Sequence, residues 1–274
     1  MALCLSLRNN ASFVFDLYGF EFDRYYQRTY GLAPFDIGHV EFARCPYRFT
    51  TARVLRYSSK KLPIVQSLSK PWFLVENSSE FREDLSTVTI TRQTYLMGYW
   101  QDERYFSSVK EKLKTTLSPR GALSLANAEL SQRIHGTNSV AIHCRRLHTV
   151  GAAANAASAS DAERRCLALG TDYYQKSIEY LSERLNNPHF FVFSDAPEWA
   201  RQNLHTRFPI AILDQGRGPD YEDIFLMSHC RHHVVANSSF SWWGAWLASD
   251  EDHIVIAPKD IQYIPNIPER WMQL

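Results

Sequence analysis

The C-terminal half of the chain predicts a doubly wound α/β domain with a parallel sheet. Three observations support this: short apolar runs alternate with helical segments, each run is apolar throughout, and polar residues follow directly at its end. Strands that are apolar on both sides are buried on both faces, which is typical of a parallel sheet covered by helices. We therefore expect this fold class from about residue 136 to the end of the chain.

Strands and helices are expected to alternate regularly in this half. The expected strands span residues 139–143, 190–193, 210–213, 233–236 and 253–257, and the expected helices span residues 171–185, 197–204, 221–230 and 241–248. Thr171 is the predicted cap of the first helix, whose apolar face, at spacings of 4, 3 and 4, consists of Tyr174, Ile178, Leu181 and Leu185. Pro197 opens the second helix, where the first turn tolerates proline. The polar residues 151–165 are predicted to form a solvent-exposed loop.

The first half of the chain is less regular. Residues 13–17 and 87–90 are predicted to be strands because both are rich in apolar or β-branched residues. Residues 95–106 contain the five aromatic residues Tyr95, Tyr99, Trp100, Tyr105 and Phe106. We interpret this cluster as core and domain-interface packing rather than as a platform on which a sugar stacks.

Composition indicates a globular protein without a strong bias toward charged partners. The 274 residues suit one large or two mid-sized domains, and the net charge of +1 gives no long-range attraction to nucleic acid or to an anionic membrane. Any bound anion must therefore be held by local contacts. The five cysteines are odd in number and lack CxxC spacing, so neither a disulfide framework nor a zinc site is indicated. No apolar run approaches the ~18 residues of a spanning helix.

The most informative segment is residues 236–246, with the sequence ANSSFSWWGAW. It follows an apolar strand and begins a segment with helical spacing, so it predicts a strand-to-helix turn. Backbone N–H groups at a helix N-terminus are unpaired and suit an anion, above all a phosphate. The alternative is an ordinary helix cap in which Ser239 or Ser241 satisfies its own helix.

Three predicted strand ends carry polar residues that suit a nucleoside diphosphate. The first ends in His143-Cys144-Arg145-Arg146, the second in Ser194-Asp195, and a later one in residues 237–241. Carboxyl ends of parallel strands share one edge of a sheet, so these residues are expected to converge. Arg145 offers a planar fork of donors for diphosphate oxygens, and Asp195 can accept two N–H bonds from a guanine edge. Taken alone, the two arginines would be an ordinary surface pair.

These expectations define the candidate site. The candidate catalytic residues are Arg145 and His143. The candidate nucleotide-binding residues are His143, Arg145, Arg146, Asp195, Asn237, Ser238, Ser239, Phe240 and Ser241. No metal site is expected, because neither residues 250–252 nor His229, His232 and His233 have a recognised ligand spacing. There is also no Walker, GxGxxG or GxSxG motif in the chain.

These motifs resemble those of the inverting α-1,2-fucosyltransferases, which move fucose from GDP-fucose to galactosides. The resemblance extends from about residue 16 to residue 258, and its motifs are residues 98–106, 143–146, 191–195, 221–228 and 236–247. It implies a GT-B-like fold with two Rossmann-like domains. Residues 1–135 would form an incomplete acceptor-side domain, and residues 136–274 would form the GDP-fucose-binding domain.

The resemblance also implies a reaction. The 2-hydroxyl of a terminal galactose would displace GDP with inversion, through an oxocarbenium-like state, without a metal or a cofactor other than the donor substrate GDP-fucose. Arg145 would hold the diphosphate and assist its departure, His143 and Asp195 would read guanine, and Ser238, Ser239 and Phe240 would contact phosphate or base. The implied partner is a galactose-terminated glycan, with no nucleic acid involved.

Two features depart from the family pattern. Family members begin with a strand and a glycine-rich GGLGNQ-type loop, whereas this chain starts near the following helix, and they carry GDY where this chain has Leu147-His148-Thr149. Without that loop, a catalytically weak or inactive GDP-sugar-binding module stays open as an alternative. A fucosyltransferase of different linkage also stays open, because one sequence does not define the acceptor surface. A eukaryotic chain with an anchor preceding Met1 would belong to the Golgi membrane or lumen, and a bacterial chain to the cytoplasm.

Overall fold

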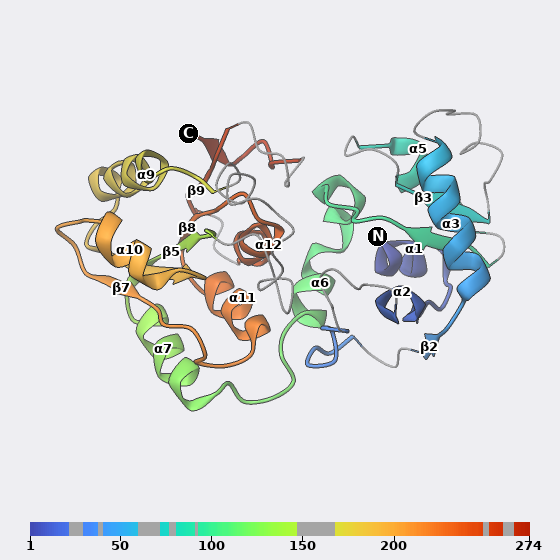
Figure 1. The fold of residues 1–274 in the computed structure, drawn as a ribbon, viewed down its shortest axis with the longest axis horizontal. Coiled ribbons are helices and arrows are strands. Elements are labelled where there is room, and N and C mark those ends of the chain that lie inside the picture. Colours follow the sequence, from blue (N-terminus) through green and yellow to red (C-terminus); the bar gives the residue numbers. More distant parts are fainter. Residues whose placement is uncertain are drawn as a thin grey trace. The chain divides into compact units, whose positions relative to one another are not determined.

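The structure is a computed structural model that describes residues 1–21, 30–37, 41–59, 72–76, 81–90, 93–146, 168–248, 252–259 and 266–274. The chain divides into two compact units, residues 1–117 and 118–274, whose elements are labelled in Figure 1. The predicted limits of 1–135 and 136–274 differ from this division in the segment 118–135. That segment contains helix α7 (Leu125–His135), which packs within the C-terminal unit.

A six-stranded parallel sheet forms the centre of the C-terminal unit. Its strands are β5 (Asn138–Cys144), β6 (Pro188–Ser194), β7 (Ile210–Ile212), β8 (His232–Val234), β9 (Val255–Ala257) and β10 (Met272–Gln273). They are arranged in the order β10-β9-β8-β5-β6-β7, and every pair is parallel. The order therefore reverses between β5 and β8. Ligands of doubly wound sheets bind at the carboxyl ends of the strands at such a reversal.

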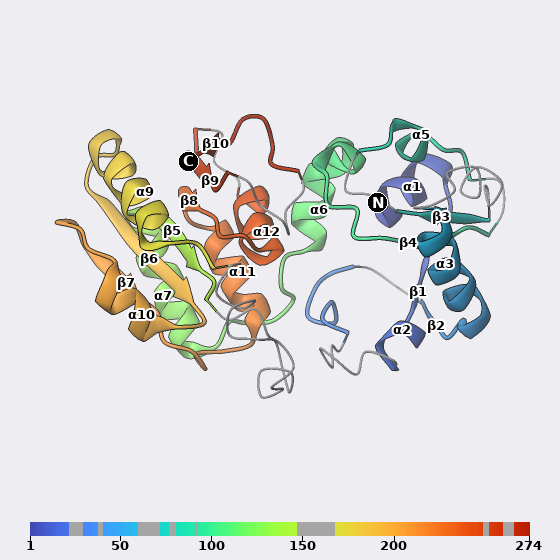
Figure 2. The same ribbon diagram turned by 45° about the horizontal axis from the view of Figure 1, so that its top comes forward.

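Helices cover both faces of this sheet, which confirms the predicted doubly wound arrangement. Helices α9 (Thr171–Arg184) and α10 (Pro197–Asn203) pack on one face against β5, β6, β8 and β9. Helices α7 and α11 (Asp220–Ser228) pack on the other face, and α12 (Ser239–Leu247) lies against α11 (Figures 1 and 2). The buried face of α9 contains Tyr174, Ile178 and Leu181, as its spacing predicts.

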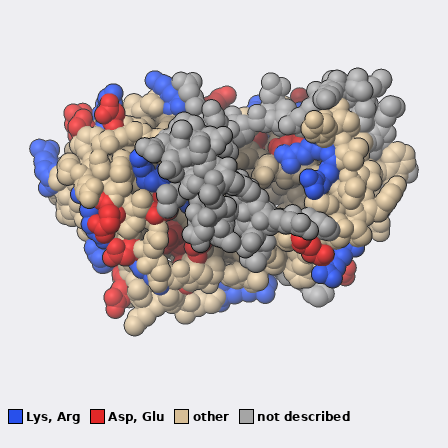
Figure 3. Space-filling view, viewed as in Figure 1, with Lys and Arg blue, Asp and Glu red and all other residues tan. Residues whose placement is uncertain are grey.

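Every strand and helix predicted in this half is present, with ends that differ by a few residues. The short edge strand β10 was not predicted, because Met272 and Gln273 form no apolar run. Residues 151–165, predicted as a loop, lie outside the described residues. On the face that Figure 3 presents, acidic and basic side chains are mixed over the C-terminal unit, as its balanced composition leads one to expect.

The N-terminal unit contains two separate pairs of parallel strands. β1 (Val14–Asp16) pairs with β2 (Glu41–Ala43), and β3 (Phe73–Val75) pairs with β4 (Tyr95–Met97). Its helices and 3-10 turns are α1 (Ala2–Asn9), α2 (Tyr18–Glu21), α3 (Pro46–Ser59), α5 (Glu83–Ser86), η1 (Glu103–Tyr105), η2 (Ser107–Val109) and α6 (Lys110–Thr116). The strand expected over residues 13–17 is confirmed as β1.

The strand predicted over residues 87–90 is wrong. Thr87 is the C-cap of α5, and residues 88–90 form no strand. The backbone N–H of Ile90 donates to the side chain of Asn9 over 2.8 Å. The Asn9 side chain thus accepts the hydrogen bond that a neighbouring strand was expected to accept. β-branched composition alone does not supply a second strand to pair with.

The aromatic cluster at residues 95–106 contributes to the core of the N-terminal unit. Trp100, Tyr105 and Phe106 are buried, and the Trp100 and Tyr105 rings meet edge to face at 5.5 Å between centroids. Tyr99, by contrast, is 68% exposed. The prediction of core packing is therefore correct for three of these rings.

No helix in the described part of the chain is long and apolar enough to cross a membrane.

Candidate functional site

The carboxyl ends of β5 and β6 bring Arg145 and Asp195 together. Cys144 and Ser194 are paired across the two strands, so the residues that follow them leave the sheet side by side. Arg145 Nη1 lies 3.2 Å from Asp195 Oδ2, and the backbone N–H of Arg146 donates to Asp195 Oδ1 over 2.8 Å. Asp195 therefore fixes both the Arg145 guanidinium and the loop that carries it.

His143, the penultimate residue of β5, connects this pair to helix α12. Its ring lies 5.5 Å from the Phe240 ring between centroids, and its Nδ1 is buried without a hydrogen-bond partner among the described residues. Burial, followed by the nearby positive charge of Arg145, lowers the pKa of His143 to about 3. The imidazole is therefore neutral at physiological pH, with a polar atom that a ligand can satisfy.

The turn after β8 leads directly into helix α12, whose N-terminus is capped. Ser238 is the N-cap of α12, and its side chain accepts from the Phe240 N–H at 3.3 Å. Ser241 Oγ accepts from the Ala236 N–H at 3.1 Å and donates to the Ser238 carbonyl at 3.2 Å. Ser239 is exposed, and within the described residues its hydroxyl has no hydrogen bond. Ser238, rather than Ser239, is thus the residue that caps this helix.

All three predicted strand ends lie at the carboxyl edge of one sheet, at the reversal between β5 and β8. Arg145 and Asp195 contact each other, and His143 contacts Phe240 at the start of α12. Arg146 is oriented differently. Its side chain donates to the Leu169 carbonyl at 2.7 Å and lies 4.1 Å from the centre of the Trp199 ring.

Asn237 and Asp195, two of the predicted site residues, also lie at this edge of the sheet. Asn237 is buried with 7% exposed, at the turn between β8 and α12. Both carboxylate oxygens of Asp195 face Arg145 and Arg146, and its carbonyl accepts from Gln215 Nε2 at 2.6 Å. The prediction that Asp195 reads guanine stays a prediction, whereas its contact with Arg145 is a direct structural feature. His148, named in the motif comparison, lies outside the described residues.

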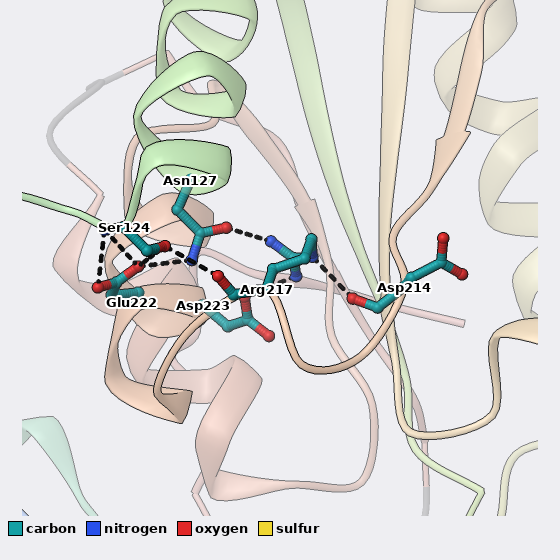
Figure 4. Close-up of polar contacts among 6 residues, drawn as sticks. All are labelled: Ser124, Asn127, Asp214, Arg217, Glu222 and Asp223. Atoms are coloured by element: carbon teal, nitrogen blue, oxygen red, sulfur yellow. Dashed lines mark hydrogen bonds and ion pairs between the residues drawn. The ribbon is translucent and has the colours of Figure 1, made fainter.

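Beside this edge lies a polar network that sequence reasoning missed, formed by the residues of Figure 4 around the buried Asn127 and Glu222. Glu222, with 3% exposed, accepts from Ser124 Oγ at 2.7 Å, from the Ser124 N–H at 3.1 Å and from Asn127 Nδ2 at 2.6 Å. Burial would raise the pKa of Glu222, but the hydrogen bonds from Asn127 and Ser124 together with the charge of Arg217 lower it overall. Glu222 therefore joins α7 to α11.

Arg217 continues the network toward the sheet. Its guanidinium donates to Asn127 Oδ1 at 2.5 Å, to Asp223 Oδ1 at 2.7 Å and to the Asp214 carbonyl at 2.8 Å. Burial raises the pKa of Asp223, partly offset by Arg217. A Cβ on Gly218 would lie 2.7 Å from Glu222 Oε2, so glycine permits this close approach. The sequence signal was the motif of residues 221–228 within the predicted helix 221–230, but no role was predicted for its acidic residues.

Buried histidines make stability depend on pH. Burial is the largest cause that lowers the pKa of His143 and His233 to about 3 and that of His229 to about 4. Below pH 6.5 the unfolded chain binds protons that the folded chain does not, so acidification lowers the free energy of unfolding. The expected slope is up to about 1.4 kcal/mol per pH unit for each histidine. Urea unfolding between pH 7 and pH 5 measures it, with His233→Gln expected to reduce the slope. A free energy that does not change over this range would contradict the account.

The cap of α12 gives a second stability prediction. Ser238→Ala removes the acceptor of the Phe240 N–H and is expected to lower the free energy of unfolding by about 1 kcal/mol. Ser239→Ala is the matched control, since its exposed hydroxyl makes no hydrogen bond within the described residues, and about 0.5 kcal/mol or less is expected. Chemical denaturation of both variants measures the difference. Equal effects would show that Ser238 is not the cap.

Comparison with known proteins gives one family and several relatives. The family model described as Glycosyl transferase family 11 matches residues 53–266. An Escherichia coli alpha-1,2-colitosyltransferase is 39% identical over 189 residues, which is 65% of this chain and 61% of the relative. The O-antigen biosynthesis glycosyltransferase WbnK of Escherichia coli is 40% identical over 33% of this chain and 30% of its own length.

A mammalian relative matches over a longer stretch at lower identity. Galactoside alpha-(1,2)-fucosyltransferase 2 of Bos taurus is 23% identical over 82% of this chain and 65% of its own length. The chain thus spans less than two thirds of the length of each of these relatives. No solved structure matches it significantly.

Proposed function

The chain belongs to glycosyl transferase family 11, and from this premise we propose that it transfers L-fucose from GDP-fucose to the 2-hydroxyl of a terminal galactoside. The observation that carries the proposal is the meeting of Arg145, Asp195 and the start of α12 at one sheet edge, with His143 between them. Two relatives whose names specify α-1,2 transfer support the linkage.

Arg145 and helix α12 suit the diphosphate of the donor. Arg145 presents charge-assisted donors in a planar fork, and the contact with Asp195 orients the guanidinium. The backbone N–H groups at the start of α12, together with the exposed Ser239 hydroxyl, add donors where the helix dipole favours an anion. The proposed binding site for the diphosphate lies between these two groups.

His143 is proposed to contact the guanine base rather than to accept the proton of the reaction. A pKa of about 3 makes its imidazole a weak base, poorly suited to remove a proton from a sugar hydroxyl near pH 7. Its unpartnered Nδ1 and the adjacent Phe240 ring instead suit a planar, polar heterocycle. The positive charge of Arg145 reinforces the neutral form of this histidine.

The proposed reaction is a single inverting displacement. The galactose 2-hydroxyl oxygen forms a bond to the anomeric carbon of fucose while the bond from that carbon to the β-phosphate oxygen breaks. The electron pair of the broken bond leaves with GDP, and the hydroxyl proton passes to solvent water. Charge develops on the departing diphosphate, and the proposed role of Arg145 is to stabilise it. One well-placed donor of this kind contributes about 3–4 kcal/mol to transition-state stabilisation.

The test measures GDP release from GDP-fucose with and without a galactose-terminated disaccharide, followed by linkage analysis of the product. We expect GDP release that depends on the acceptor, that gives an α-1,2-linked product and that is unchanged by EDTA. Loss of turnover on chelation would refute the metal-independent mechanism. A product with another linkage would refute the galactose 2-hydroxyl as the acceptor group. GDP binding without any product would identify the inactive GDP-sugar-binding module.

A second candidate donor comes from the relative named for colitosyl transfer, which is 39% identical to this chain. A colitosyl donor that also carries GDP would use the same diphosphate contacts and would differ from GDP-fucose only in the transferred sugar. Competition between fucosyl and colitosyl donors in one reaction decides between them. We expect fucose to be transferred faster, and a preference for colitose would overturn this part of the proposal.

A further inference from the structure

The turn that follows β7 contacts the candidate site through Gln215. β7 ends at Ile212 and lies beside β6, so the residues after the two strands share the carboxyl edge of the sheet. Gln215 Nε2 donates to the Asp195 carbonyl at 2.6 Å, and Gln215 is an exposed residue. Sequence reasoning predicted a strand over residues 210–213 but assigned no role to the residues that follow it. This turn is therefore a further part of the edge that can meet a ligand.

The chemistry of this hydrogen bond fixes the orientation of the Gln215 amide. A backbone carbonyl only accepts hydrogen bonds, so the amide nitrogen must face Asp195. The amide oxygen, Oε1, is then left as an acceptor, and no hydrogen bond to it occurs within the described residues. Gln215 thus offers an acceptor of fixed identity to a donor group of a ligand.

The turn that carries Gln215 is held on both sides. The Asp214 side chain forms an ion pair with Arg201 of α10. On the other side, Arg217 donates to the Asp214 carbonyl and into the polar network of Figure 4. Gly216, between these anchors, has a φ of 76°, a conformation that glycine adopts without strain. An acceptor on such a fixed backbone loses little conformational entropy when a ligand binds.

The carboxylates near Gln215 already have partners. Asp195 accepts from the Arg146 N–H through Oδ1 and contacts Arg145 through Oδ2. The Asp214 carboxylate is in its own ion pair. An N–H group of a neutral base would have to displace one of these partners, and charge-assisted contacts are stronger than neutral ones. Gln215 Oε1 is therefore available to such a group at lower cost than either carboxylate.

The position of Gln215 along the edge suits the far side of a guanine that contacts His143. His143 lies on β5 and Gln215 follows β7, so only β6 separates the two strands. Neighbouring strands are about 4.8 Å apart, which puts β5 and β7 about 10 Å apart, a distance that a purine bridges with one hydrogen bond at each end. Guanine carries its acceptors O6 and N7 on one side and its 2-amino donor on the other. A base with an acceptor at the unpartnered His143 Nδ1 therefore directs its 2-amino group toward β7.

We infer that Gln215 Oε1 accepts a hydrogen bond from the 2-amino group of guanine and makes the donor site selective for that base. The inference rests on the proposed function, because it concerns the base of GDP-fucose. It gives Gln215 the contact with guanine that the resemblance implies for Asp195, whose carboxylate contacts Arg145. The expected signature is discrimination between guanine and hypoxanthine, which differ only by this amino group.

The experiment titrates GDP and inosine diphosphate into the full chain by calorimetry, since inosine diphosphate is GDP without the 2-amino group. The wild type is expected to bind GDP about fivefold more tightly, as one hydrogen bond allows. Gln215→Met, which keeps the side-chain length without the amide, is expected to bring this ratio to about one. The matched control is Gln175→Met on α9, where Nε2 donates to the His205 carbonyl at 3.1 Å, and the wild-type ratio is expected to remain.

Each failure has its own signature. If Gln215 acted only by supporting the Asp195 backbone, Gln215→Met would weaken both nucleotides equally and keep the wild-type ratio, which would overturn the inference. Equal wild-type affinities for the two nucleotides would also overturn it, while GDP binding would leave the proposed function standing. A wild-type chain that binds UDP but not GDP would refute the proposed donor and the inference with it. If thermal melting shows that Gln215→Met does not fold, Gln215→Ala replaces it, with the same ratio expected.

Discussion

Arg145→Ala is expected to lower kcat/KM for GDP-fucose by about 10²–10³-fold, because it removes the donor aimed at the departing diphosphate. The same change is expected to weaken GDP binding at least tenfold, since charge-assisted hydrogen bonds contribute about 1.5–3 kcal/mol. Initial-rate kinetics and GDP titration measure the two effects. Guanosine, which lacks phosphate, is expected to bind wild type and variant alike.

Two further variants make this result specific. Asp195→Asn keeps the side-chain shape but removes the charge that orients Arg145, so a smaller loss in the same direction is expected. Arg184→Ala removes an exposed guanidinium from the end of α9, just before the amino end of β6, and activity is expected to stay at the wild-type level. An Arg145→Ala enzyme with wild-type GDP affinity would show that this arginine does not contact the diphosphate.

Glu222→Ala is expected to lower the free energy of unfolding by about 3 kcal/mol, because buried donors lose their shared acceptor. The Ser124 N–H and hydroxyl and Asn127 Nδ2 all point at this carboxylate, and Arg217 donates to the same Asn127 from its other side (Figure 4). Urea denaturation of the full chain measures the loss. The network joins α7 to α11, so the loss is expected for the whole C-terminal unit.

Glu222→Gln is the matched variant for this prediction. Glutamine keeps the volume and one acceptor oxygen but turns an amide toward donors, so an intermediate loss is expected. Glu183→Ala, on the exposed end of α9, is the surface control and is expected to change stability by about 0.5 kcal/mol or less. A loss below about 1 kcal/mol for Glu222→Ala would mean that water replaces the carboxylate at no cost.

The sheet of the C-terminal unit was predictable because its strands are apolar throughout and bounded by polar residues. Val140, Ile142, Phe191 and Val192 are fully buried, and burial on both faces is the property that such runs encode. The convergence of residues 143–146, 194–195 and 237–241 followed from the same reasoning. Parallel strands bring their carboxyl ends to one edge whatever the intervening sequence is.

Side-chain pairing was less predictable than strand position. The contact between Asp195 and Arg145 was not predicted, although the two opposite charges leave adjacent strands side by side. The contact between Ser124 and Glu222 joins residues 98 positions apart, and no local pattern specifies it. The false strand at residues 87–90 shows the same limit, because Asn9 supplies a partner from a distant part of the chain.

The structure of crystals soaked with GDP tests the central claim most directly. The account predicts the diphosphate within hydrogen-bond distance of the Arg145 guanidinium and of the backbone N–H groups at the start of α12, with guanine beside His143 and Phe240. GDP bound elsewhere, or bound at this edge with its diphosphate away from Arg145, would contradict the account.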